Sequence, residues 1–290
     1  MTGSPSPIRA IALMLTAMAL LPGIDVIAKF LGQSGMPIVQ IVWARLIFGA
    51  LLTLPFAVRH VGFRGLLPGR PMMHLLRGAL LMAATFFFFF SLKTLAIAEA
   101  LSIFFVQPLI VTALSPFLLG EKVGPRRWLA VAVGFIGTLI IIRPGIVDVS
   151  VGTYYALAAG ASLALYFLMT RAISGQAAAV VTTFHTNLMG TLVATVAVVL
   201  VWQAPTSTEW AMFILLGLVA VLGHYLITRA YDFGEASLLA PLAYTEIISS
   251  TIMGWYFFDN IPDGWTFVGV GVLIASAIYI SFRERAQKQA

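Results

Sequence analysis

Long apolar runs that follow one another along the whole chain are the feature that most constrains how this sequence can fold. Each run has about the 20 residues that an α-helix needs to cross the hydrocarbon core of a bilayer. Pro, Gly and charged residues separate the runs, and most of the connections are short. The pattern predicts an all-α integral membrane protein with ten transmembrane helices, at residues 9–32, 37–58, 71–93, 98–119, 127–143, 151–172, 178–202, 208–230, 236–258 and 264–282.

The composition excludes a soluble globular protein. The chain has 290 residues, of which 60% are hydrophobic and only 10% are charged, whereas soluble domains average about 25% charged residues. So few charges cannot cover a soluble protein of this size, and the remaining surface must face lipid. Cysteine is absent, which excludes disulfides and thiolate metal sites.

The positions of the basic residues predict the orientation in the membrane. With both termini in the cytoplasm, most of the 17 Lys and Arg residues lie on the cytoplasmic side. Only Lys29, Lys93 and Arg143 fall toward the opposite side, and Arg45 lies within a span. This asymmetry follows the positive-inside rule. The net charge of +6 therefore faces the anionic leaflet, and no nucleic-acid partner is expected.

Sequence similarity between distant segments indicates an internal duplication. Residues 93–100 resemble residues 229–236, and Trp128 and Gly134 have counterparts in Trp265 and Gly271 at a nearly constant offset.

The expected halves are residues 9–143 and residues 151–282, with five helices each. An odd number of helices forces the second half into the membrane upside down. Inverted repeats of this kind are typical of secondary transporters, in which a site near the middle of the membrane is exposed to each side in turn.

Three short motifs carry a resemblance to a known family: Trp43-Ala44-Arg45, Ile97-Ala98-Glu99-Ala100 and Leu119-Gly120-Glu121. With two copies of five helices, they resemble the EamA branch of the drug/metabolite transporter superfamily, and within it amino-acid exporters of the YddG type. The resemblance implies a substrate cavity lined by the first, third, fourth, sixth, eighth and ninth helices, with the second helix outside it and the fifth and tenth peripheral. It also implies a multi-pass protein of a bacterial inner membrane.

Glu246 is the first candidate for substrate binding. The expected span places it about eleven residues from the start of a helix, near the bilayer centre, where an isolated acid costs about 2.5–3.5 kcal/mol by insertion scales. Tyr244 is nearby, and Ser249 lies on the same helix face. Glu246 either contacts a substrate amine or titrates with protons, or it is a neutral acid that joins two helices.

Asp25 and Lys29 are four residues apart and share a helix face. They form a structural salt bridge, or they bind the ammonium and the carboxylate of an amino acid; alternatively, Lys29 extends out from the helix end. Arg45 either binds a carboxylate with two hydrogen bonds or pairs with carbonyls or acids of neighbouring helices.

The remaining candidates lie in the fourth, eighth and ninth helices. His224 and Tyr225 are expected to face the cavity, where His224 can relay protons, although a lone membrane histidine more often bonds a neighbouring helix. Gln107 belongs to a polar segment beside Pro108. Pro108 and Pro241 occupy matching positions in the two halves and are candidate gating residues, because proline permits a kink.

These patterns predict an exporter of small amphipathic metabolites, amino acids including aromatic ones, by alternating access. Exporters of drugs or other metabolites and a membrane-embedded enzyme are the alternatives; the motifs expected of an enzyme are missing. A small-molecule substrate and the lipid bilayer are the expected partners. No cofactor and no metal are expected, and a homodimer remains an alternative to a monomer.

Overall fold

The computed structural model describes residues 7–67, 69–120, 124–143, 149–172, 179–233, 242 and 245–288. All regular elements of these residues are helices. Seven helical segments are long and apolar enough to cross a membrane, and residues 131–142 and 264–276 form two shorter apolar helices.

The described helices lie where the apolar runs predicted helices, and residues 236–241 of the ninth run lie outside the described residues. Their count as ten membrane spans, and their orientation, remain predictions. The elements are α1 (Pro7–Leu20), α2 (Pro22–Gln33), α3 (Ile38–Val61), the 3-10 helix η1 (Arg64–Leu66), α4 (Pro71–Ser91), α5 (Ile97–Phe104), α6 (Gln107–Leu119), α7 (Pro125–Ile142), α8 (Val151–Ala172), α9 (Ala179–Val201), α10 (Ser207–Phe233), α12 (Thr245–Phe258) and α13 (Gly264–Lys288).

Within the described part of the chain, two of the expected spans are interrupted helices. The first span breaks at Leu21, directly before Pro22, and separates α1 from α2. The fourth span breaks at residues 105–106, before Pro108, and separates α5 from α6. Proline cannot donate a backbone hydrogen bond and its ring crowds the preceding turn. The sequence predicted a kink at Pro108, whereas a single continuous helix was expected around Pro22.

Side chains close the first turns of two helices. Thr206 and Glu209 form a capping box at the start of α10, in which the Thr206 backbone N–H donates to Glu209 and the Glu209 N–H donates back to the Thr206 hydroxyl. Asp263 caps α13, because its carboxylate accepts the Thr266 backbone N–H at 2.9 Å and the Thr266 hydroxyl at 2.7 Å. Local sequence therefore fixes where both helices begin.

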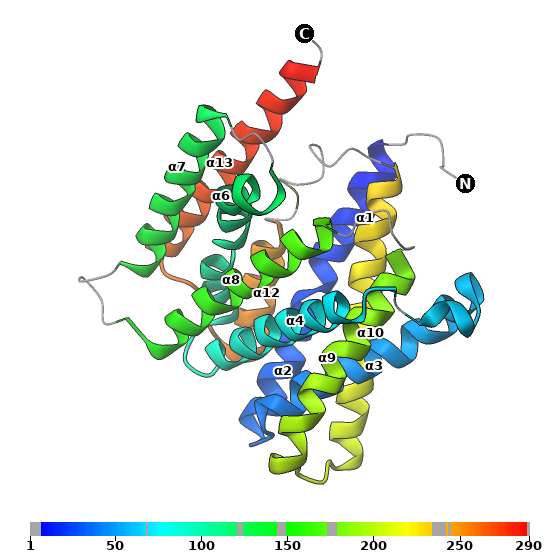
Figure 1. Ribbon diagram of the computed structural model, residues 1–290. Coiled ribbons are helices and arrows are strands. Elements are labelled where there is room, and N and C mark those ends of the chain that lie inside the picture. The colour runs from blue at the N-terminus through cyan, green and yellow to red at the C-terminus, as the bar shows by residue number, and fades with distance from the viewer. Residues whose placement is uncertain are drawn as a thin grey trace.

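Helix pairs from distant parts of the chain make up the interior. The main packing partners are α3 with α9, α7 with α13, α4 with α8 and α1 with α10, and α4 and α10 also pack against α9 and α3, respectively. In Figure 1, α7 and α13 lie side by side at one edge of the molecule. The family resemblance implied that the fifth and tenth helices are peripheral, and α7 and α13, which correspond to them, lie at this edge.

The outer surface is apolar, as a lipid-facing surface must be. Large hydrophobic side chains such as Phe56, Val196 and Leu200 are exposed, Leu200 by 84%. In a soluble protein so many exposed apolar side chains would favour aggregation, but hydrocarbon is their natural environment.

Candidate functional site

Four ionisable side chains from four different helices lie within electrostatic range of one another, and Asp25 is the most buried of them. We call Asp25 of α2, Arg45 of α3, His224 of α10 and Glu246 of α12 the central cluster. Asp25 interacts electrostatically with both Arg45 and Glu246, and Arg45 interacts with His224. The structure thus brings together three of the predicted site residues and adds Arg45 to them.

Both acids of the central cluster lie near the start of a helix. Asp25 is in the first turn of α2, and Glu246 is in the first turn of α12. The N-terminal end of a helix carries partial positive charge and favours a carboxylate. The sequence placed Glu246 in the middle of one long helix; in the structure it lies one residue after the start of the described helix.

Arg45 interacts with side chains of several neighbouring helices. One of its terminal nitrogens donates a hydrogen bond to the Thr85 hydroxyl of α4, and the side chain also interacts electrostatically with Tyr166 of α8. Its Nε is buried and has no hydrogen-bond partner among the described residues. Arg45 therefore lies on the expected second helix and yet interacts with Asp25 and His224 of other helices.

A signal for Arg45 existed in the sequence. Arg45 stands inside an apolar run, and ionisable residues within membrane spans usually mark a functional site. The family resemblance, in contrast, implied that the second helix lies outside the substrate cavity.

Lys29 does not form the salt bridge with Asp25 that their spacing allowed. Its ammonium donates a hydrogen bond to the Leu95 carbonyl at 3.2 Å and lies 5.0 Å from the centre of the Phe258 ring. It also interacts electrostatically with Glu99. Lys29 thus joins α2 to the start of α5, and Asp25 remains available to Arg45.

Ser249 provides a hydrogen bond at the helix interruption before Pro22. Its hydroxyl contacts the carbonyl of Met18 at 2.6 Å and that of Glu246 at 3.0 Å. In a continuous helix the Met18 carbonyl would accept the backbone N–H of residue 22, but proline has none. Ser249 replaces that donor and joins α12 to the end of α1, while its predicted role in substrate binding stays a prediction.

Three of the other predicted residues, Tyr225, Gln107 and Pro108, are described and occupy other places in the structure. Tyr225 lines a groove on the outside of α1 and α10 and is 58% exposed. Gln107 and Pro108 begin α6, directly after the interruption that follows α5. Pro241 and Tyr244 lie outside the described residues.

A second polar cluster lies between α4, α8 and α9. The Arg77 side chain is only 1% exposed; its Nε donates to the Thr170 hydroxyl at 3.1 Å, and its guanidinium lies 5.4 Å from the centre of the Tyr166 ring. The His185 Nε2 is 2.6 Å from the Leu66 carbonyl, and its ring lies 4.8 Å from that of His74. For His185 the structure therefore shows the bond to a neighbouring segment that is usual for a membrane histidine.

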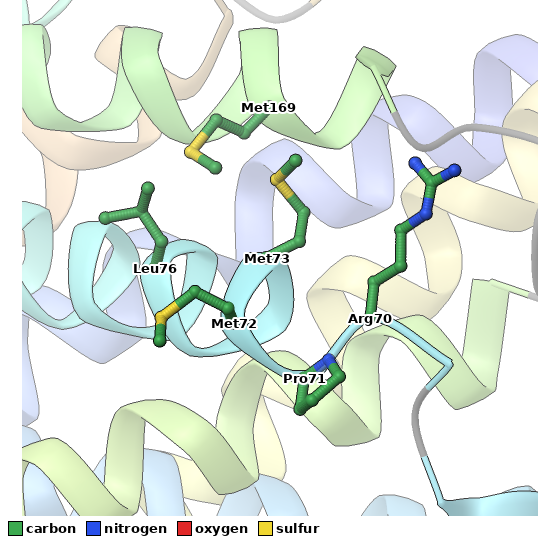
Figure 2. Close-up of a pocket in the computed structure, with 6 residues that line it drawn as sticks. All are labelled: Arg70, Pro71, Met72, Met73, Leu76 and Met169. Carbon is green, nitrogen blue, oxygen red and sulfur yellow. The ribbon is translucent and has the colours of Figure 1, made fainter.

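Metal binding finds no support in these contacts. Among the described residues, no three His, Cys, Asp or Glu side chains are placed to share a metal ion. A groove of about 370 Å³ lies between α4 and α8, and Figure 2 shows three methionines among its lining side chains. It contains no residue of the central cluster; its lining residues are Arg70, Pro71, Met72, Met73, Leu76 and Met169.

Membrane-crossing helices with an apolar exterior define a multi-pass membrane protein. The model of the EamA-like transporter family matches residues 8–143 and 150–282. The chain belongs to the EamA-like transporter family.

Relatives of known name are similar over most of their length. An S-adenosylmethionine uptake transporter of Rickettsia bellii is 28% identical over 261 residues, which are 90% of this chain and 89% of the relative. A riboflavin transporter of Vibrio cholerae is 25% identical and covers 95% and 93% of the two chains. A pseudopaline exporter of Pseudomonas aeruginosa is 29% identical, with 86% and 88% covered. All three are transporters, and their names differ in substrate and in direction.

A solved crystal structure supports the fold. It has a TM-score of 0.66 to this protein at 20% sequence identity, and the match covers 92% of this chain and 94% of the other. At this identity, the likeness concerns the fold alone.

Proposed function

We propose that the protein is a secondary transporter that exports small zwitterionic metabolites, namely amino acids including aromatic ones, by alternating access. The observation that carries this proposal is the presence of two carboxylates and one guanidinium in the central cluster. An α-amino acid has an ammonium and a carboxylate a few ångströms apart, and the cluster offers a partner of opposite charge to each.

Each charged group has a role in this proposal. Arg45 binds the substrate carboxylate, because a guanidinium with a free Nε can form two parallel hydrogen bonds with a carboxylate. Asp25 and Glu246 attract the substrate ammonium. Burying these groups without a substrate is costly, and a bound zwitterion would satisfy both signs of charge at once.

The similar proteins are compatible with such a substrate without specifying it. S-adenosylmethionine, named for the Rickettsia bellii relative, is itself an amino acid with an ammonium and a carboxylate. Riboflavin, named for the Vibrio cholerae relative, has neither group. The charges of Asp25, Glu246 and Arg45 favour the zwitterion over the neutral vitamin.

The packing of the helices supports two related halves. In the proposed duplication, α1–α2, α3, α4, α5–α6 and α7 correspond in order to α8, α9, α10, the segment that contains α12, and α13. Exchanging corresponding helices turns the α4–α8 contact into α10–α1 and the α4–α9 contact into α10–α3, and all four contacts exist. The contacts α3–α9 and α7–α13 each join two corresponding helices, so the exchange leaves them unchanged. Such symmetry is what alternating access between two inverted halves requires.

Counterflow in proteoliposomes with truncated substrates tests the proposal. Phenylalanine carries both charges, phenethylamine lacks the carboxylate and 3-phenylpropionate lacks the amine; riboflavin serves as a neutral competitor. We expect exchange of phenylalanine and little exchange of the two truncated molecules. Transport of riboflavin without transport of any amino acid would contradict the proposal.

Substitutions test which residue binds the carboxylate of the substrate and which binds its ammonium. In Arg45→Gln, the preference for phenylalanine over phenethylamine should fall at least about tenfold, because only the carboxylate contact is lost. In Glu246→Gln, the preference for phenylalanine over 3-phenylpropionate should fall instead. Arg59→Gln, at the exposed end of α3, is the matched control and should keep both preferences. Unchanged preferences in the first two variants would remove these residues from the site.

The direction of transport needs its own test. Export is proposed from the resemblance to amino-acid exporters. Cells that produce the protein and are loaded with labelled phenylalanine should lose the label faster than cells that produce Arg45→Gln. Faster uptake with unchanged loss would assign import instead.

A further inference from the structure

A groove of about 490 Å³ runs along the outside of the α1–α10 pair. We call it the α1–α10 groove. It contains none of the four residues of the central cluster. Its lining residues are Arg9, Ala12, Leu13, Thr16, Tyr225, Leu226, Arg229 and Phe233.

The groove has a charged end and an apolar body. In Figure 1, the start of α1 lies beside the end of α10. Ala10 and Ala230 belong to the same buried cluster at this point. Arg9 and Arg229 directly precede these two alanines and both line the groove, so the two arginines belong to the same end of it.

The rest of the groove follows from helix periodicity. Ala12, Leu13 and Thr16 are three, four and seven residues beyond Arg9 and therefore lie on one face of α1. The Thr16 hydroxyl donates to the Ala12 carbonyl at 2.8 Å, so its proton is already engaged. Beyond the two arginines, the lining is therefore largely apolar.

The chemistry of the groove matches an amphiphile with an anionic head. None of the eight lining residues is acidic, and two guanidinium groups at one end attract a phosphate. Arg229 lies 5.1 Å from the centre of the Phe233 ring, a contact that orients its planar group. A free phosphate would use only the charged end, whereas a lipid also fills the apolar body.

We propose that the α1–α10 groove binds an anionic glycerophospholipid, with its phosphate between Arg9 and Arg229 and one acyl chain along Leu13 and Leu226. Both arginines lie at ends of membrane-crossing helices, where lipid phosphates are found. The proposal does not depend on the substrate of the transporter.

Lipid retention measured by native mass spectrometry tests the site. The full-length protein is purified from nanodiscs of defined phosphatidylglycerol and phosphatidylcholine content. We expect phosphatidylglycerol to remain bound after detergent exchange and phosphatidylcholine to be lost. Glycerol phosphate at equal concentration should not displace the bound lipid, because it lacks the acyl chain. Equal retention of both lipids, or displacement by glycerol phosphate, would overturn the proposal.

Charge variants make the test specific. Arg9→Gln/Arg229→Gln should lower phosphatidylglycerol retention at least about tenfold, and Arg9→Lys/Arg229→Lys should retain a larger share because the charge is kept. Arg59→Gln/Arg64→Gln removes two exposed charges outside the groove and should behave as the unmodified protein. A fall in this control equal to that in the groove variant would show a general charge effect and refute the site. Unchanged retention in the folded Gln variant would refute it as well.

Discussion

Single side chains stabilise the irregular points of this helical fold, and Ser249 is a clear case. The sequence suggested Ser249 as a substrate contact because it shares a helix face with Glu246. The structure shows that its hydroxyl contacts the Met18 carbonyl, which Pro22 leaves without its usual donor. A polar residue on the same helix face as Glu246 therefore bonds the backbone.

Ser249→Ala is expected to lower stability and leave substrate preference unchanged. The substitution leaves the Met18 carbonyl unsatisfied, which costs about 1 kcal/mol or somewhat more. Thermal unfolding of the protein in detergent should show a lower midpoint. Ser162→Ala is the matched control, because the Ser162 hydroxyl bonds the Ala158 carbonyl within its own helix. An altered preference between phenylalanine and phenethylamine at unchanged stability would instead place Ser249 in the binding site.

Asp263 provides a prediction about pH. Partial burial acts to raise the pKa of Asp263, but hydrogen bonds from Thr266 and the pairing with Arg143 outweigh it and lower the pKa below its usual value. The carboxylate therefore contributes stability above the usual aspartate pKa of about 4. That contribution is lost as the pH falls through the lowered pKa of the folded protein.

Two variants separate the charge of Asp263 from its capping role. Asp263→Ala removes the cap of α13 and should cost about 1 kcal/mol. Asp263→Asn keeps a capping oxygen, and its deficit relative to the unmodified protein should be present at pH 7 and shrink as the pH falls below about 4. Thermal midpoints between pH 7 and pH 3 measure both effects, with Asp259→Asn as a nearby exposed control. A deficit of Asp263→Asn that persists below the pKa would contradict the assigned charge effect.

At the level of helices, close packing of α4 on α9 depends on two glycines. A Cβ added to Gly78 would lie 2.8 Å from the Met189 carbonyl carbon, and one added to Gly190 would lie 2.9 Å from the Gly78 carbonyl oxygen. Side chains at either position would force these helices apart. The same pair of helices carries Arg77 and His185, so the glycines also position the second polar cluster.

Gly78→Ala should destabilise the protein by about 1–3 kcal/mol, because backbone atoms must move to make room. The control is Gly32→Ala, since a Cβ at Gly32 meets nothing within 4 Å and alanine favours the helix. Thermal unfolding of both variants in the same detergent compares them. Equal midpoints for Gly78→Ala and the unmodified protein would show that the α4–α9 contact is looser than the structure has it.

The sequence predicted the positions of helices well and the contacts of side chains less well. Apolar runs of the right length locate helices because lipid requires every backbone group to be bonded within the segment. Pro108 marked an interruption, whereas residues 9–32 were predicted as one span because the apolar run continues through Pro22. The surroundings of Arg45 and Tyr225 depend on which helices pack together. Local sequence patterns do not predict this pairing of helices.

At the level of the whole molecule, the orientation predicted from Lys and Arg can be tested directly, because the chain lacks cysteine. Single cysteines report accessibility without a prior cysteine-free variant. Phe63 lies between α3 and α4 and is 77% exposed, and Ala204 is exposed between α9 and α10. In the predicted orientation, these two positions lie on opposite sides of the membrane.

A membrane-impermeant maleimide should label Ala204→Cys in intact cells and label Phe63→Cys only after the membrane is permeabilised. Labelling of the two positions with a permeant maleimide is the control for reactivity. The reverse pattern would invert the predicted topology, and labelling of both from outside would reject the positive-inside assignment.

The exchange of packing partners between corresponding helices has an energetic consequence. If one rearrangement breaks the contact of α4 with α8 and preserves that of α10 with α1, the mirrored rearrangement does the opposite at a similar cost. In the proposed duplication, exchanging the halves relates the two resulting conformers, so neither is expected to be a deep trap. Solute concentrations on the two sides would decide which conformer is populated, which lets a small helical protein cycle without a chemical fuel.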